Sequence, residues 1–119
     1  MNKSMLIINR QSPWSGPGAR EALDIALAGG AFDLPLAMLF LDDGVFQLMS
    51  DQQPAQLEQK DLAANLRALP MFGIDELYVA LGSLDERGLN VVDLGIPAQP
   101  LVDSELSALI ARFDHVITL

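Results

Sequence analysis

The sequence predicts a single-domain, three-layer α/β/α sandwich built on a mainly parallel sheet of about five strands. Short apolar runs alternate along the chain with segments of helical spacing, which is typical of parallel strands joined by crossover helices. Residues 36–41 are apolar without interruption, as expected for a strand covered on both faces. The chain has 119 residues, of which 50% are hydrophobic, and this fits one packed core. We therefore expect one domain spanning residues 1–119.

The first half of the chain predicts two strands and two helices. Residues 4–8 form an apolar first strand, and residues 36–41 form the second. Residues 19–29 have apolar side chains at helical spacing, and Pro17 fits near the first turn of such a helix. We expect Gly29 and Gly30 to end this helix. Residues 57–69 predict the second helix, with Pro70 as its stop and three leucines on one side, namely Leu62, Leu66 and Leu69.

The second half predicts shorter elements in the same alternating order. Residues 77–81 form the third strand. Ser83 and Glu86 match a capping box for a very short helix that Gly88 closes. We expect a short fourth strand at Val91 and Val92, and a loop with two prolines over residues 95–100. The last two elements are a helix that Asp103 or Ser104 caps and that ends at Arg112, with Leu106, Leu109 and Ile110 inward, and a strand over residues 115–119.

Composition excludes several classes of function. The chain has no cysteine, so it cannot form a disulfide, a thiolate metal site or a persulfide. Its formal charge is −9 and its seven basic residues are scattered, which argues against direct contact with nucleic acid. The apolar run at residues 5–8 is too short for a signal peptide or a membrane span. We expect a soluble cytoplasmic protein that has no direct contact with nucleic acid or membrane.

Three sets of residues could carry chemistry, and for each a structural role is the better interpretation. Gly16-Pro17-Gly18 follows the first strand, but it lacks a phosphate-loop pattern and Pro17 removes an amide, so we expect a tight turn. Asp42 and Asp43 follow the second strand but lack a third carboxylate for Mg²⁺, which favours turn acids. His115 begins the last strand, opposite the edge where ligands bind, and fits a surface or structural histidine. The sequence therefore predicts no catalytic residue, no cofactor and no metal site.

The loop after the second strand instead predicts contact with another protein. It carries Val45, Phe46, Leu48 and Met49, with almost nothing polar enough for chemistry. Trp14, the only tryptophan, lies in the loop after the first strand, at the same edge of the predicted sheet. A lone monomer rarely exposes such an apolar rim, and tryptophan is favoured at protein interfaces. We expect these five residues to form a partner interface.

Four segments in order resemble the TusC / DsrF-like family, a branch of the DsrE/DsrF/DsrH-like sulfur relay proteins. Residues 43–48 are similar to the central motif of that family. Residues 18–24 resemble its Gly-Arg-Glu-x-Leu-Asp segment with one inserted residue, and residues 83–89 resemble its Ser-Leu-x-x-Arg-Gly-Leu segment. Residues 113–117 resemble its last strand, aromatic-Asp-x-Val-Ile. The resemblance spans essentially the whole chain.

This resemblance implies a subunit of a TusBCD-like sulfur-relay complex that supports 2-thiouridine formation at the tRNA wobble position. The implied assembly is a heterohexamer, a dimer of heterotrimers with TusB-like and TusD-like subunits. It receives sulfur from a TusA-like protein and hands it to a TusE-like protein. In TusD-like relatives the carrier is a cysteine after a central strand, and the matching position here lies near Ala80. The resemblance thus implies a structural or docking subunit, not an enzyme.

Two other functions stay open at this point. A flavodoxin-like or receiver-like domain would use Asp42 and Asp43 to hold Mg²⁺, although a receiver also needs an aspartate at the end of the third strand, where residues 79–82 have none. The chain could also be a homo-oligomeric module that binds a small ligand. The sequence leaves open the roles of Asp42, Asp43 and His115, and which partner Trp14 faces.

Overall fold

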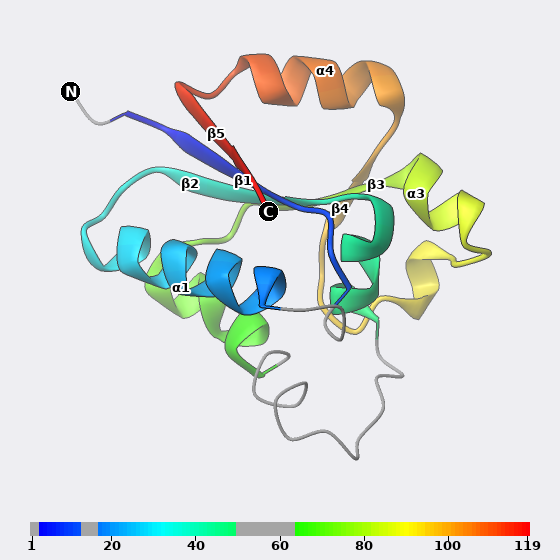
Figure 1. The fold of residues 1–119 in the computed structure, drawn as a ribbon, viewed down its shortest axis with the longest axis horizontal. Coiled ribbons are helices and arrows are strands. Elements are labelled where there is room, and N and C mark those ends of the chain that lie inside the picture. Colours follow the sequence, from blue (N-terminus) through cyan, green and yellow to red (C-terminus); the bar gives the residue numbers. More distant parts are fainter. Residues whose placement is uncertain (1–2, 13–16, 50–63) are drawn as a thin grey trace.

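The computed structural model describes residues 3–12, 17–49 and 64–119 of the chain. Within these ranges five strands form one sheet in the order β4-β3-β2-β1-β5, and every neighbouring pair is parallel (Figure 1). The strands are β1 (Met5–Asn9), β2 (Leu36–Phe40), β3 (Leu77–Ala80), β4 (Gln99–Leu101) and β5 (His115–Thr118).

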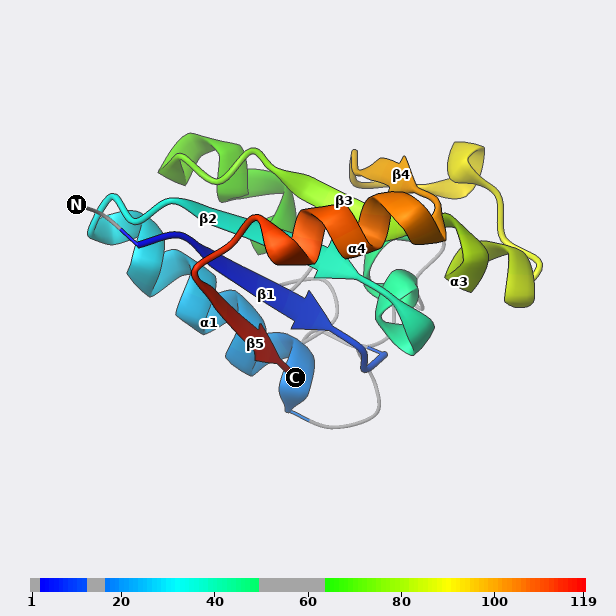
Figure 2. The same ribbon diagram turned by 90° about the horizontal axis from the view of Figure 1, so that it is seen from above.

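Helices cover both faces of this sheet, which confirms the predicted three-layer sandwich. Helix α1 (Gly18–Ala31) and the helical residues 64–68 lie on one face, followed by the 3₁₀ helix η2 (Leu69–Phe72). Helix α4 (Asp103–Ala111) lies on the other face (Figures 1 and 2). Three short helices lie near the ends of the strands: η1 (Asp42–Leu48), α3 (Leu81–Glu86) and η3 (Val91–Asp93). No helix in the described part of the chain is long and apolar enough to span a membrane.

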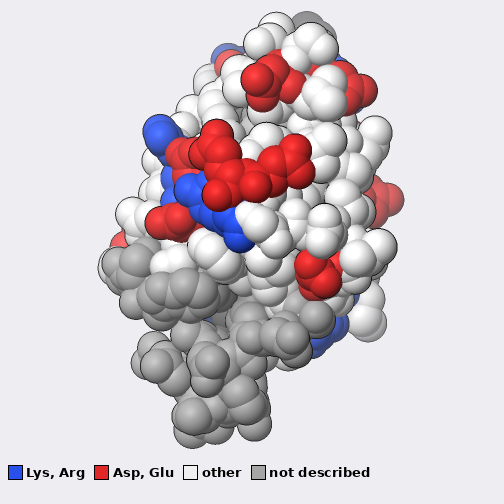
Figure 3. All heavy atoms as spheres, turned by 90° about the vertical axis from the view of Figure 1, so that its right-hand side faces the viewer, with Lys and Arg blue, Asp and Glu red and all other residues white. Residues whose placement is uncertain are grey.

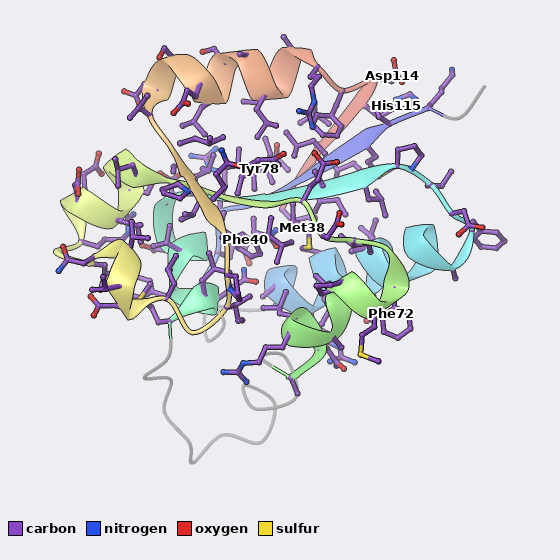
Figure 4. All side chains as sticks on the ribbon, turned by 180° about the vertical axis from the view of Figure 1, so that it is seen from behind. Met38, Phe40, Phe72, Tyr78, Asp114 and His115 are labelled. Atoms are coloured by element: carbon purple, nitrogen blue, oxygen red, sulfur yellow. The ribbon has the colours of Figure 1, made fainter. Side chains whose placement is uncertain are left out.

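The sheet separates two apolar cores because successive side chains of a strand point to opposite faces. On β1, Ile7 packs into the larger core against α1, while Leu6 and Ile8 pack into the smaller core under α4. All five residues of β2 are buried, as the uninterrupted apolar run predicts. Figure 4 shows Met38 and Phe40 on the α1 side of the sheet, where both side chains are 0% exposed.

The fourth strand lies elsewhere than the sequence predicts. Val91 and Val92 belong to η3, and Val92 is 90% exposed, so the expected strand at these residues is wrong. The strand is instead β4, inside the segment predicted to be a loop because of its two prolines. Proline lacks a backbone N–H, but an edge strand tolerates it, and among the described strands β4 lies at the edge of the sheet beside β3.

Helix α1 also continues beyond its predicted end. It passes through Gly29 and Gly30 and ends at Ala31. A side chain at Gly29 would collide with Leu36, and a Cβ at Gly30 would lie 2.9 Å from the carbonyl oxygen of Phe72. The two glycines therefore permit close packing of α1 on its neighbours instead of ending the helix.

Three smaller expectations are corrected as well. Ser83 lies inside α3, which begins at Leu81, so it is not the predicted cap. Helix α4 begins with a bond from the backbone N–H of Val102 to Glu105 Oε1, 3.0 Å long, and not with a cap from Asp103 or Ser104. On α4 Leu109 is buried as expected, but Ile110 is 37% exposed. Of the predicted helix over 57–69, residues 57–63 lie outside the described residues.

Candidate functional site at the carboxyl edge of the sheet

The carboxyl ends of parallel strands meet at one edge of a sheet, and ligands of open α/β folds usually bind there. In this protein Arg10 follows β1, η1 follows β2 and α3 follows β3. The edge therefore brings together Arg10, Asp42, Asp43, Ser83 and Arg87. Figure 3 faces this side of the molecule, where acidic side chains gather around a few basic ones and no wide basic patch is visible.

Asp42 is held from two sides. Its Oδ2 lies 2.7 Å from Nε of Arg10, in an ion pair whose side chains are 57% and 40% exposed. Its backbone N–H donates a 2.9 Å hydrogen bond to Oγ of Ser83. The backbone of Asp42 is left-handed, with φ of 51°, which aspartate tolerates better than most residues. Asp42 is thus a turn residue that joins the ends of the first three strands.

Arg87 makes the matching contacts to Asp43. Its Nε lies 3.0 Å from Oδ1 of Asp43, and its Nη1 donates a 3.1 Å hydrogen bond to the carbonyl oxygen of Ser83. Each of the two adjacent aspartates therefore has its own arginine. Within the described ranges no three side chains of Asp, Glu, His or Cys come together as metal ligands would. The Mg²⁺-binding alternative thus lacks a ligand set in this part of the chain.

The four predicted interface residues that the structure describes fall into two groups by burial. Val45 and Leu48 are 0% exposed and belong to the larger core, so the chain covers these side chains itself. This corrects the premise that the apolar loop needs a partner to cover it. Phe46 and Met49 are partly buried, and Met49 pairs with Leu94 in an isolated β-bridge. Trp14 lies outside the described residues.

Val45 and Leu48 are buried because η1 packs against the larger core on the α1 side of the sheet. The carbonyl oxygen of Leu48 accepts a 2.7 Å bond from the N–H of Gly95, which ties η1 to the segment before β4. Gly44 approaches β1 so closely that a Cβ there would collide with the carbonyl oxygen of Asn9. The segment after β2 is a 3₁₀ helix and not an open loop. The sequence does not predict this helix because Asp-Asp-Gly is typical of turns.

Two buried polar side chains lie near this turn and were not predicted. Asn9 ends β1 at 1% exposure, and its side-chain nitrogen and oxygen have no hydrogen-bond partner among the residues that the structure describes. Gln47 is also 1% exposed, and its Nε2 donates a 2.9 Å bond to the carbonyl oxygen of Gln11. An asparagine directly after an apolar strand is the signal that could have indicated the first of them.

The strand β3 ends at Ala80, near the position where the resemblance places a carrier cysteine in TusD-like relatives. Ala80 is 4% exposed and precedes the first residue of α3. Its side chain is a methyl group, which has no lone pair to hold sulfur. The chemistry of a thiolate carrier is therefore missing at this position, in a chain without any cysteine.

The glycine-rich turn before α1 also has a structural explanation. The carboxamide of Gln11 occupies the space that a Cβ on Gly18 would need. Gly18 thus allows the close contact of Gln11 with the start of α1. Gly16, the first residue of the predicted turn, lies outside the described residues.

A second polar cluster joins β3 to α4. Oε1 of Glu76 accepts bonds from Tyr78 Oη at 2.8 Å and from Arg112 Nη2 at 2.7 Å. Burial raises the pKa of Glu76, but the bonds from Tyr78 and Arg112 and the charge of Arg112 outweigh it, so this pKa lies below the usual value. Burial and the bond to Glu76 raise the pKa of Tyr78. Glu76 and Tyr78 also line a shallow hollow of about 600 Å³ beside β4.

His115 lies away from both clusters. It is exposed at the start of β5, and Figure 4 shows it beside Asp114 near the amino-terminal end of β1. Oδ2 of Asp114 accepts a 2.9 Å bond from the backbone N–H of Ser4, and this bond lowers the pKa of Asp114. The bonds between Asp114 and Ser4 connect the start of β5 to the start of β1, and His115 is exposed beside them.

Comparison with known proteins gives a consistent result. The model of the DsrE/DsrF-like family matches residues 3–119. The chain is 66% identical over 119 residues to the "Protein TusC homolog" of Pseudomonas aeruginosa, with 100% of both chains covered. It is 33% identical over 116 residues to the "Protein TusC homolog" of Pasteurella multocida, covering 96% of this chain and 98% of the relative.

More distant similarities agree with these. The chain is 38% identical over 92 residues to the "Intracellular sulfur oxidation protein DsrF" of Allochromatium vinosum, covering 77% of this chain and 68% of that protein. The crystal structure of the ychN protein from E. coli superposes with a TM-score of 0.78 over 100% of both chains at 19% identity. A conserved protein of unknown function from Bacteroides thetaiotaomicron gives a TM-score of 0.66 at 11% identity, covering 97% and 94% of the two chains. At these identities the solved structures support the fold alone.

Proposed function

The chain belongs to the DsrE/DsrF-like family, and we propose that it is the TusC-type subunit of a sulfur-relay complex. In this role it supports formation of 2-thiouridine at the tRNA wobble position without carrying sulfur itself. The observation that carries the proposal is the 66% identity to a TusC homolog over the full length of both chains.

The role without sulfur follows from the chemistry of the carboxyl edge. A persulfide carrier needs a thiolate, and the chain has no cysteine to supply one. Ala80 fills the end of β3 with a buried methyl group. The thioether of methionine cannot replace a thiol because it has no ionisable S–H. We infer that the chain is not an enzyme and that its contribution to sulfur transfer is indirect.

The proposed partners are a TusB-like and a TusD-like subunit in a heterohexamer. The assembly would receive sulfur from a TusA-like protein and hand it to a TusE-like protein, all in the cytoplasm and without direct contact of this chain with tRNA. The formal charge of −9 supports the last point, because phosphate backbones repel such a chain. Of the interface residues proposed from sequence, Phe46 and Met49 are partly exposed, and we propose these two as partner contacts.

Deletion of the chain from its native cell tests this proposal. We expect 2-thiouridine in total tRNA, measured by mass spectrometry of nucleosides, to fall strongly and to return when the wild-type chain is supplied. The TusB-like and TusD-like proteins should co-purify with the tagged chain. Unchanged 2-thiouridine in the deletion strain, together with the absence of both partners from the purified chain, would contradict the proposed function.

A further inference from the structure

Large apolar side chains are exposed where α1 and η2 end. Phe32 is 80% exposed, Met71 is 87% exposed and Phe72 is 52% exposed, with Leu34 at 37% beside them. We call these four residues the Phe72 surface. Scattered exposed apolar residues are ordinary, but several aromatic and methionine side chains in adjoining segments are typical of a protein interface.

The two segments end with the same backbone arrangement. After α1, the N–H of Asp33 bonds to the carbonyl of Gly30 and the N–H of Leu34 bonds to that of Gly29, both at 3.1 Å. After η2, the N–H groups of Gly73 and Ile74 bond to the carbonyls of Pro70 and Leu69, again at 3.1 Å. In both cases the residue after the phenylalanine is left-handed, Asp33 with φ of 57° and Gly73 with φ of 84°.

This arrangement is the Schellman motif, which fixes the end of a helix through paired hydrogen bonds. It places Phe32 and Phe72 at equivalent positions of two helix ends. Both phenylalanines are therefore presented by ordered backbone, so a partner binds them without first having to order a loop. Figure 4 shows Phe72 on the outer side of the helical layer, away from the sheet.

The two helix ends lie against each other. A Cβ at Gly30 would lie 2.9 Å from the carbonyl oxygen of Phe72 and 3.1 Å from Cδ1 of Ile74. Since Gly30 belongs to the first motif and Phe72 and Ile74 belong to the second, the two helix ends are packed against each other. Ile74 is 1% exposed and anchors this surface to the larger core.

In the described part of the chain, both segments of the Phe72 surface are flanked by exposed acidic side chains. Asp33 lies between Phe32 and Leu34, and Asp75 follows Ile74; both aspartates are exposed. Arg67, on the helical residues before η2, is the basic residue of the same segment. A second copy of a chain with a formal charge of −9 would bring further aspartates against these two. A partner whose contact surface has an apolar centre and a basic rim complements the Phe72 surface better than a second copy of this chain does.

We propose that the Phe72 surface is the docking site for another subunit of the relay complex, one with an apolar centre and Lys or Arg at its rim. This inference rests on the proposed function, because that function supplies the partner subunits. Phe32 and Phe72 are the anchors that insert into the partner, and Asp33 and Asp75 steer its basic residues.

The test uses the full chain co-expressed with the TusB-like and TusD-like subunits of the same cell. Phe32→Ser combined with Phe72→Ser should weaken assembly at least about tenfold, measured by gel filtration and by titration of the purified subunits. Asp33→Asn combined with Asp75→Asn should slow association a few-fold at low salt and little at high salt, because asparagine keeps the left-handed backbone but removes the charge. The matched control is Val92→Ser, since Val92 is 90% exposed on η3, in a different segment.

Each outcome separates the surface from the function. If the wild-type chain assembles and the double serine variant assembles equally well, with unchanged circular dichroism, the proposed surface is wrong while the proposed function stands. Dimers of the wild-type chain alone that the double serine variant abolishes would assign the surface to a second copy and overturn the proposal. Failure of the wild-type chain to assemble with both subunits would contradict the proposed function itself.

Discussion

The backbone N–H of Asp42 donates a 2.9 Å hydrogen bond to Oγ of Ser83, and this bond joins the turn after β2 to the helix after β3. Arg87 strengthens the same junction through the carbonyl of Ser83 and the carboxylate of Asp43. At the edge where other α/β proteins bind substrates, these polar groups bind one another. The carboxyl edge is therefore held together by its own polar contacts, and the chain has no cysteine that could carry sulfur there.

Close packing of η1 on β1 predicts a large effect of Gly44→Ala. The added methyl group would collide with the backbone carbonyl oxygen of Asn9, which cannot rotate away as a side chain could. We expect a loss of about 2 kcal/mol or more in the free energy of unfolding, measured by urea denaturation. Gly82→Ala is the control, because its Cβ would meet nothing nearer than Asp103 Oδ1 at 3.8 Å and alanine favours the helix. Equal stability of the two variants would contradict the described packing.

Burial of Leu48 in the chain's own core predicts a folding defect in the isolated chain. Leu48→Ala removes a side chain that is 0% exposed and should cost about 2–5 kcal/mol of unfolding free energy. Val92→Ala, at a position that is 90% exposed, should change this free energy by less than about 0.5 kcal/mol. Thermal and urea denaturation of the isolated chain measure both. A stable Leu48→Ala monomer that fails only in assembly would return Leu48 to the partner interface.

Arg87 predicts a measurable contribution from a partly buried ion pair. Its side chain is 21% exposed, and it bonds both Asp43 and the carbonyl of Ser83. Arg87→Met should lower the unfolding free energy by about 1 kcal/mol, because the exposed partner Asp43 reduces the electrostatic part. Arg20→Met breaks an exposed 3.4 Å ion pair with Asp24 along α1 and should lower the unfolding free energy by only about 0.3 kcal/mol. If Arg87→Met and Arg20→Met lowered the unfolding free energy equally in parallel denaturation experiments, the contacts of Arg87 would add no more stability than an exposed ion pair.

The lowered pKa of Glu76 predicts a dependence of stability on pH. The folded chain holds this carboxylate ionised through its bonds to Tyr78 and Arg112, so below the ordinary pKa of glutamate the unfolded chain binds more protons than the folded one. The stabilisation is complete above that ordinary pKa and is lost as the pH falls through the lower pKa of the folded state. Glu76→Gln should therefore lose less stability than the wild type over this acidic window, in urea titrations at a series of pH values. Parallel curves for the two proteins would contradict the assignment.

Periodicity predicted the layers and most strands because those features depend on which residues are buried. The run at 36–41 is apolar throughout because β2 is central, and the structure buries every residue of β2. The sequence does not predict the fourth strand because a proline such as Pro100 is typical of loops. The position of β4 at the edge of the sheet is what allows a proline there. Two consecutive glycines indicate a helix end from sequence alone, and their packing against Leu36 and Phe72 is visible only once the chain has folded.

The site was less predictable than the fold. An apolar segment after a strand is compatible with burial by a partner or by the chain itself, and composition does not distinguish the two. The structure buries Val45 and Leu48 within the chain. The exposed phenylalanines were not predicted because their exposure follows from left-handed residues at two helix ends, one of which is Asp33 instead of the usual glycine.

The central claim is that this chain supports sulfur transfer without holding sulfur, and intact-mass measurement of the assembled complex tests it most directly. The complex of this chain with the TusB-like and TusD-like subunits is mixed with a persulfide-charged TusA-like protein, and the mass of every subunit is then measured without reductant. We predict an increase by the mass of one sulfur atom on the TusD-like subunit, none on this chain, and a much smaller increase when this chain is omitted. A sulfur adduct on this chain, or equal loading of the TusD-like subunit in its absence, would contradict the account.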